Sequence, residues 1–289
     1  MAIFDAGAVS IRALGSGDIA AAAALNAAAG WNQIDADWRI MLDLGCGFAV
    51  DGADGALAAT AIALPYDGAF GWISMVLVAS GHRRRGLASA LVNRCIDTLR
   101  GADLTPVLDA TPAGRDVYRG LGFRDLWAMR RLAGEAFADP VTHPAGITFR
   151  AAVPADLPAL GAYDAPVFGA DRTALLAHLR ERLPQAAVVA ERAGRIAGFA
   201  LGRDGRRANQ VGPVAADDAG VAVALLARSL GALKGPVYVD VADRHTSVAA
   251  WLEAHGFRSE RPLTRMALAR DRAFDDPNRL FAVAGPELG

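Results

Sequence analysis

Two short glycine motifs recur along this chain at one fixed separation, and this repetition limits the possible folds most strongly. Gly86-Leu87-Ala88 returns 134 residues later as Gly220-Val221-Ala222, and Gly122-Phe123 returns at the same offset as Gly256-Phe257. A constant offset between matching positions, in matching order, indicates a duplicated structural unit. The chain has 289 residues, which is room for two domains of ordinary size.

The two halves also begin alike. Arg12 is followed after five residues by Asp18, and Arg150 is followed after five residues by Asp156. We therefore expect an α/β fold of the α+β type, with two tandem units, each a mixed central sheet flanked by helices. A stretch between them has two prolines and no periodicity, which is typical of a linker. The expected boundaries are 1–134 for the first unit, 135–146 for the linker, and 147–289 for the second unit with a C-terminal tail.

In the first half, an arginine-rich loop connects a predicted strand to a predicted helix. The apolar run Trp72–Val78 is too short to span a membrane and has the length of a buried strand. Apolar residues then recur four apart over Leu87–Leu99, as on one face of a helix. Between them, Gly86 permits close approach of a ligand to the backbone. The free N–H groups and the dipole of the helix N-terminus favour a phosphate there.

Composition excludes several classes of function. The formal net charge is −1, so the overall charge favours neither nucleic acid nor an anionic membrane as a partner. Cys46 and Cys95 form no disulfide framework and no metal-ligand spacing. The N-terminus lacks a basic segment followed by an apolar signal core, and no apolar run approaches about 18 residues. We expect a soluble cytoplasmic protein with no metal and with no nucleic-acid or membrane partner.

Two motifs in the first half resemble a known family. Val78–Ala88 resembles the acyl-CoA signature of the GNAT N-acetyltransferases, Arg/Gln-x-x-Gly-x-Gly/Ala after a strand. Tyr118–Phe123 resembles the second signature of that superfamily, Tyr-x-x-x-Gly-Phe. The resemblance covers residues 8–132 fully and 147–270 partially. The layout is similar to the bacterial subgroup with two GNAT units in tandem, whose substrates are largely unassigned.

The resemblance implies acetyl-CoA as a cosubstrate, bound by the strand and by the start of the helix. Strand backbone would pair with the pantetheine arm, and the N–H groups of the helix start would hold the pyrophosphate. The alternative is an ordinary helix N-terminus beside a solvated basic cluster. Where the family usually has Asn, seven residues before the tyrosine, this chain has Thr111. The cofactor-binding candidates are Val76, Leu77, Val78, Arg83, Arg84, Arg85, Gly86, Leu87, Ala88, Ser89 and Thr111.

The resemblance also implies the chemistry. Tyr118 is the candidate general acid, because a phenol can protonate the thiolate that an attacking amine expels. The alternative is an aromatic ring packed under the Gly-Phe turn. Asp109, at the end of its predicted strand, is one candidate for the base. A carboxylate that bonds backbone at the strand-to-helix turn is the interpretation that we favour for it.

The resemblance implies that the first predicted helical pair shapes the acceptor pocket. Trp31 and Asp35 would suit an ammonium group, by cation–π contact and ion pairing, and Tyr66 is a third candidate. The alternatives are that Asp35 caps the second helix and that the aromatic residues belong to the core. We expect N-acetylation of a small amine by direct attack on the thioester. The alternatives are a non-catalytic acyl-CoA-binding regulator and a protein or peptide N-acetyltransferase, and a homodimer is one open oligomeric state.

The second half has lost the residues expected to do the chemistry. At the shared offset, Asp217 and Asp218 replace the first two arginines of the loop, and Leu252 replaces the tyrosine. Carboxylates suit a helix N-terminus but repel a pyrophosphate. We therefore expect a second unit that keeps the fold without the catalysis. The tail, Asp275–Gly289, is apolar enough that we expect it to dock along this unit or in the inter-domain groove. The alternative is that Glu287 or the C-terminal carboxylate reaches the acceptor site.

Overall fold

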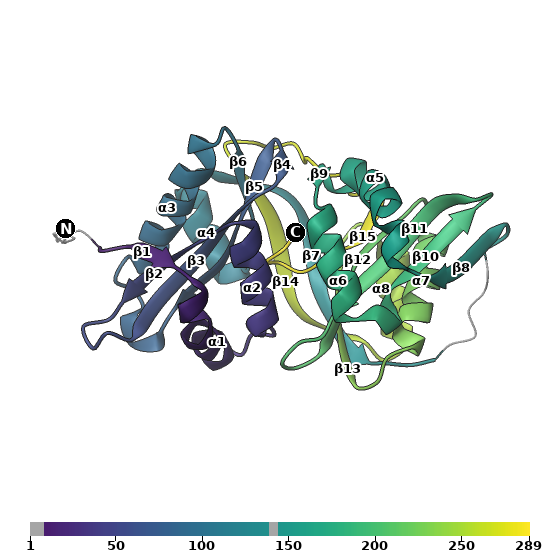
Figure 1. Ribbon diagram of the computed structural model, residues 1–289, viewed down its shortest axis with the longest axis horizontal. Coiled ribbons are helices and arrows are strands. Elements are labelled where there is room, and N and C mark those ends of the chain that lie inside the picture. Colours follow the sequence, from purple (N-terminus) through teal and green to yellow (C-terminus); the bar gives the residue numbers. More distant parts are fainter. Residues whose placement is uncertain (1–8, 139–143) are drawn as a thin grey trace. The chain divides into compact units, whose positions relative to one another are not determined.

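A computed structural model describes residues 9–138 and 144–289 of the chain (Figure 1). Its contacts define two compact units. Unit 1 contains residues up to Pro65 together with Gly71–Pro106, and unit 2 contains Tyr66–Phe70 together with Val107–Gly289. The two repeats of the sequence are its first half and its second half.

Unit 1 is an antiparallel sheet with three helices. The sheet order is β1-β2-β3-β5. The apolar face expected for the arginine-loop helix is real: Leu91, Cys95 and Leu99 are buried. The elements are β1 (Arg12–Leu14), α1 (Ile19–Ala28), α2 (Asp35–Leu44), β2 (Cys46–Asp51), β3 (Leu57–Pro65), β5 (Phe70–Val78, its first residue in unit 2) and α3 (Leu87–Gly101).

The matching starts of the two halves form the same ion-pair clamp. Arg12 on β1 binds Asp18, at the start of the first helix, at 3.0 Å and Asp51 on β2 at 2.6 Å. In the second half, Arg150 binds Asp156 at 2.7 Å and Glu191 at 2.6 Å. The duplication predicted from spacing is therefore present in side-chain contacts as well.

Unit 2 contains a mixed sheet with the order β6-β14-β7-β13-β15-β12-β11-β10-β8. A short pair, β4 (Asp67–Gly68) with β9 (Ala170–Asp171), lies outside it. The strands are β6 (Thr105–Ala110, its last four residues in this unit), β7 (Phe123–Glu135), β8 (Ile147–Ala151), β10 (Val188–Arg192), β11 (Arg195–Arg203), β12 (Asn209–Ala216), β13 (Pro236–Ala242), β14 (Arg258–Leu268) and β15 (Leu280–Ala282). The helices are α4 (Pro112–Gly120), α5 (Leu157–Phe168), α6 (Thr173–Arg182), α7 (Ala219–Gly231) and α8 (Thr246–Ala254).

The last long strand of each half is exchanged with the other half. β14, from the second half, pairs antiparallel with β6, and β7, from the first half, pairs antiparallel with β13. β14 and β7 also pair with each other. This exchange explains why the compact units do not follow the expected boundary at residue 134. The expected linker includes residues 139–143, which lie outside the described residues, and its first residue, Glu135, is still part of β7.

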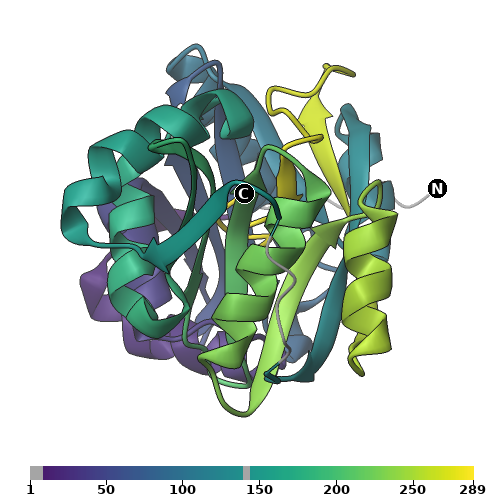
Figure 2. The same ribbon diagram turned by 90° about the vertical axis from the view of Figure 1, so that its right-hand side faces the viewer.

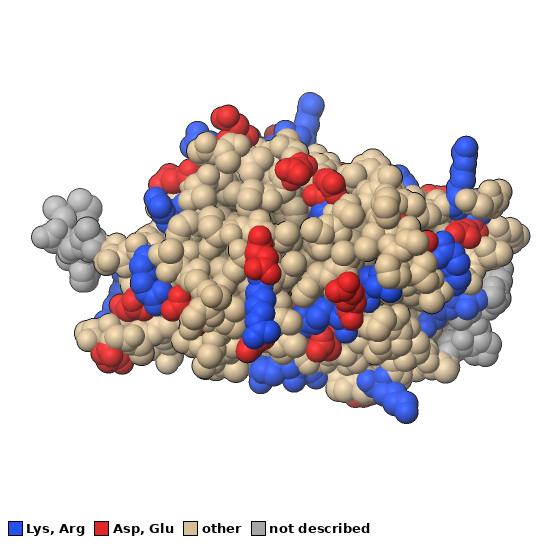
Figure 3. All heavy atoms as spheres, in the orientation of Figure 1, with Lys and Arg blue, Asp and Glu red and all other residues tan. Residues whose placement is uncertain are grey.

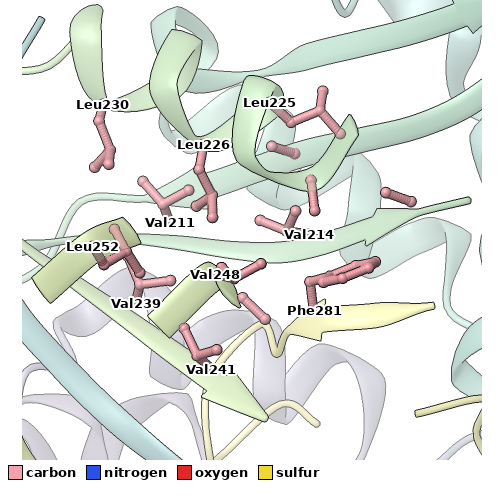
Figure 4. Packing of buried hydrophobic residues seen from close by; sticks show 14 of the residues in the cluster. Val211, Val214, Leu225, Leu226, Leu230, Val239, Val241, Val248, Leu252 and Phe281 are labelled. Carbon is pink, nitrogen blue, oxygen red and sulfur yellow. The ribbon is translucent and has the colours of Figure 1, made fainter. Parts of the chain in front are cut away.

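The core of the second half lies between the sheet and helices α7 and α8 (Figures 2 and 4). Leu225, Leu226 and Leu230 of α7 and Val248 and Leu252 of α8 point toward the strands. Because strand side chains alternate between the two faces, the neighbouring strand residues point the other way. There they meet α5, where the Tyr163 ring lies 6.2 Å from the Phe199 ring. Figure 2 shows α7 and α8 together on the near face of the sheet.

On the face shown in Figure 3, basic and acidic side chains lie next to one another. Among the helices of residues 9–138 and 144–289, none combines the length and the apolar character that a membrane span requires.

Candidate functional site

Strand β5 carries a bulge at the candidate pantetheine segment. Its register with β3 shifts between Thr60 and Ile62, so that Met75 and Val76 together oppose one β3 residue. Met75 adopts a left-handed backbone, with φ of 50°, and its carbonyl accepts a 2.9 Å bond from the buried Thr60 hydroxyl. Bulges of this kind are common beside active sites, where they turn backbone groups out of the ladder.

Sequence reasoning missed Met75 and Thr60. Met75 lies within Trp72–Val78, a segment without glycine, so no local residue type marks the left-handed backbone. The neighbouring candidates are on β5 as expected: Leu77 is buried, and Val76 and Val78 are half-buried.

The N-terminus of α3 fits a phosphate group. Gly86 is the N-cap in a left-handed conformation, with φ of 78°, and no side chain caps the helix. The first helical bond runs from Ala90 N–H to Gly86 C=O, at 3.0 Å. The N–H groups of the first turn, at Leu87, Ala88 and Ser89, therefore have no acceptor within the helix. Such donors, at the positive end of the helix dipole, bind anions.

The loop before α3 adds positive charge. Arg83, Arg84 and Arg85 are exposed, and the Arg83 Nε donates a 3.4 Å bond to Val78 C=O. Arg84 also has a left-handed backbone, with φ of 60°. Arg83 before it is extended, with φ of −66° and ψ of 157°.

In unit 2, α4 presents the candidate acid. Thr111 is its N-cap and accepts a 3.3 Å bond from Gly114 N–H, and Pro112 occupies the first helical position as expected. The Thr111 hydroxyl is therefore used in capping, while its own proton remains available to donate. Tyr118 is half-buried, and its ring centre lies 6.0 Å from that of Phe123.

Asp109 is tied to an arginine from the second half of the chain. Both of its oxygens accept bonds from Arg265 on β14, at 3.0 and 3.1 Å, and its side chain is fully buried. Arg265 also binds Asp275 at 2.7 Å and lies 4.3 Å from the ring centre of Trp127. Burial raises the pKa of Asp109 to about 6, while Arg265 opposes this rise. With both oxygens engaged, Asp109 fits a structural carboxylate better than a free base, although its partner is a side chain and not the backbone.

The acceptor candidates fall into different environments. Trp31 is half-buried, and Asp35 is exposed at the start of α2. The expected alternative for Asp35 is wrong, because Asp37 accepts the capping bond from Ile34 N–H, at 2.8 Å.

Tyr66 belongs to unit 2 and is buried. Its hydroxyl donates a 2.7 Å bond to Leu288 C=O, and its ring lies edge-on to Phe168 at 4.9 Å. Burial raises the pKa of its hydroxyl. These contacts favour the core interpretation that we left open for Tyr66.

The start of α7, which corresponds to the start of α3, has a shorter loop and is capped by a side chain. The connection from β12 to α7 is only Asp217-Asp218, whereas Ala79–Gly86 connects β5 to α3. The Asp218 carboxylate caps α7 by accepting from Val221 N–H at 2.9 Å. The predicted carboxylates therefore lie at this helix N-terminus.

Models of one family match both halves. The acetyltransferase (GNAT) family model matches residues 22–123, and the acetyltransferase (GNAT) domain model matches residues 161–282. This chain belongs to the GNAT acetyltransferases. The expected tandem arrangement of two GNAT units, with a mixed α/β fold, is thereby confirmed.

Similar proteins agree with this family. The uncharacterized N-acetyltransferase YitH of Bacillus subtilis is 27% identical over 188 residues, which cover 65% of this chain and 66% of YitH, just under two thirds of its length. A proposed acetyltransferase of Pyrococcus horikoshii superimposes with a TM-score of 0.79 at 18% identity, over 100% of this chain and 98% of that one. A tandem GNAT protein from the clavulanic acid biosynthesis pathway gives 0.64 at 15% identity, over 89% and 97%. At these identities the two structures show the fold alone.

Proposed function

We propose that this chain transfers the acetyl group of acetyl-CoA to the nitrogen of a small amine. The observation that supports this most directly is the glycine-led N-terminus of α3, which no side chain caps, in the element that follows the bulged strand β5 and its arginine-rich loop. The first-turn N–H groups from Leu87 to Ser89, with the exposed arginines before them, would hold the pyrophosphate. Backbone of Val76–Val78 would pair with the pantetheine arm.

In the proposed reaction, the amine attacks the thioester directly and Tyr118 acts as the acid. Acetyl-CoA supplies an acyl thioester. The neutral amine nitrogen attacks its carbonyl carbon, an N–C bond forms, and collapse of the tetrahedral adduct breaks the C–S bond. Tyr118 gives its phenolic proton to the departing thiolate, and the nitrogen loses its surplus proton to solvent. No covalent enzyme intermediate is required.

A small cationic amine is the acceptor that the first half favours. The exposed carboxylate of Asp35 and the half-buried indole of Trp31 both lie in the α1–α2 region of unit 1. A carboxylate attracts an ammonium group by charge, and an indole face attracts it by its quadrupole. The nitrogen must then lose a proton before attack, so turnover should rise with pH until the amine is neutral.

Tyr118→Phe tests the assignment of the acid. The substitution removes the phenolic proton and keeps a ring that packs against Phe123, so kcat should fall by about 100-fold or more while the Kd for acetyl-CoA changes little. The assay measures thiol release from acetyl-CoA against a panel of small amines and peptides, with binding measured by calorimetry. An unchanged kcat would remove Tyr118 from the mechanism.

The same assay separates the alternative functions. Tight acetyl-CoA binding with no turnover on any acceptor would identify a regulator. Turnover on peptides but not on small amines would identify a protein N-acetyltransferase.

A further inference from the structure

The second half repeats the bulge of the first half. The register of β11 with β12 shifts between Ala200 and Gly202, so that Gly212 and Pro213 together oppose one β11 residue. This bulge lies on the strand that precedes α7, just as the Met75 bulge lies on the strand that precedes α3. Each half therefore has a bulge on the strand before its central helix.

In the second half, the C-terminal strand β15 lies beside the bulge of β12. β12 and β13 pair directly only at Asn209–Gln210 with Val237–Tyr238. Beyond this point β15 lies between them, and Ala282 is paired antiparallel with both strands. Two further bonds continue the contact, from Ala216 N–H to Arg279 C=O and from Val283 N–H to Asp240 C=O, each 3.0 Å long.

The fit of the tail over the bulge is close. A Cβ atom on Gly212 would lie 2.0 Å from the carbonyl oxygen of Val283, so only glycine leaves room for the tail there. Leu280, Phe281 and Ala282 are at most 2% exposed. Figure 4 shows Phe281 beside Val214 and Val241 in the core.

Buried polar groups anchor the end of the tail. Glu287 forms an ion pair with Arg203, and both side chains are buried. Gln210 accepts from Arg203 at 3.0 Å and donates to Asp240 at 2.7 Å. Arg172 donates to the backbone oxygen of Gly289 at 2.7 Å. A segment held by such bonds, and joined covalently to its site, competes with any free ligand at high effective concentration.

We propose that Arg279–Val283 is an intramolecular ligand of the second half, seated at the duplicated bulge where the first half would receive the extended arm of acetyl-CoA. The comparison with the first half rests on the proposed function. An extended peptide and an extended pantetheine arm make the same kind of contact with a strand edge. With the edge taken by the tail and the helix N-terminus taken by Asp218, the second half binds no acetyl-CoA.

Hydrogen–deuterium exchange of the full chain, with and without acetyl-CoA, tests the proposal. We expect slow exchange over residues 211–216 and 279–283 in both states, and acetyl-CoA-dependent protection of residues 76–90 only. Calorimetry should give one acetyl-CoA per chain. Protection at the start of α7, or two molecules per chain, would overturn the proposal.

Gly212→Ala adds a direct perturbation. The new Cβ displaces Val283, so residues 279–283 should exchange at least tenfold faster than in the wild type. Gly231→Ala, where the nearest atoms are 3.8 Å away, is the matched control and should leave exchange unchanged. Equal exchange in both variants would also overturn the proposal. If Gly212→Ala does not fold, the wild-type measurements alone decide.

The experiments distinguish a failure of the proposed function from a failure of the proposal for the tail. An absence of acetyl-CoA binding anywhere, together with slow exchange of the tail, would refute the donor site of the first half and still support a closed second half.

Discussion

The substitution Arg265→Met would leave two carboxylates buried without their common counter-ion. In the wild type, Arg265 bonds both oxygens of Asp109 and one oxygen of Asp275, and the arginine is 2% exposed. Methionine approximates the length of the aliphatic stem, so the loss is mainly electrostatic. Removing one partner of a buried pair costs about 3–5 kcal/mol of unfolding free energy, because a buried charge loses its compensation.

The cost should depend on pH in a defined direction. Burial already raises the folded-state pKa of Asp109 to about 6, above its unfolded value of 3.8. The folded state therefore binds more protons than the unfolded state between these values, and stability falls as pH rises through that window. Without Arg265 the folded-state pKa rises further, so the variant should lose more stability at pH 7.5 than at pH 5.

Urea unfolding at the two pH values measures this difference. We expect a loss of about 3–5 kcal/mol at pH 7.5 and a clearly smaller loss at pH 5. Arg258→Met, on the same strand but exposed and bonded only to backbone oxygens, is the control and should stay within about 0.5 kcal/mol. A loss below about 1 kcal/mol at pH 7.5, or equal losses at both pH values, would refute the argument.

Two further predictions concern the starts of α4 and α7. Gly114→Ala should lower kcat with little change in acetyl-CoA affinity, because its Cβ would lie 3.0 Å from the ring of Tyr118. Gly120→Ala is the control, because a Cβ there meets no atom within 4 Å, and it should leave kcat unchanged in the thiol-release assay. Asp218→Ala should lower the unfolding free energy by about 0.5–2 kcal/mol, since the bond to Val221 N–H is lost, and Asp218→Asn should restore most of it in urea unfolding.

Features with a local pattern could be predicted from the sequence. The four-residue spacing of Leu91, Cys95 and Leu99 predicted the buried face of α3, and Thr111-Pro112 predicted the start of α4. The prediction that the tail docks on the second half is also confirmed, by the pairing of β15. Each of these three predictions depends on residues close together in the sequence or on the apolar character of a segment.

The partners of single polar residues could not be predicted in this way. Asp109 was expected to bond backbone, yet its partner, Arg265, is 156 residues away. Glu287 was an alternative for the acceptor site, and its carboxylate pairs with the buried Arg203. Charge complementarity acts through space, and many arginines of this chain would satisfy the same rule.

The tandem repeat of one α/β unit could be predicted from the amino-acid sequence, as could the restriction of the arginine-rich loop and glycine before a helix to the first copy. Repeats, periodicity and turn residues can be recognised from the order of residues along the chain. The three-dimensional structure was needed to see that β7 and β14 are exchanged between the halves and that each half has a bulge before its central helix. It also shows that β15 lies beside the second of these bulges. Strand order and register follow from which distant edges bury the most apolar surface with all backbone groups bonded, and no local pattern encodes that choice.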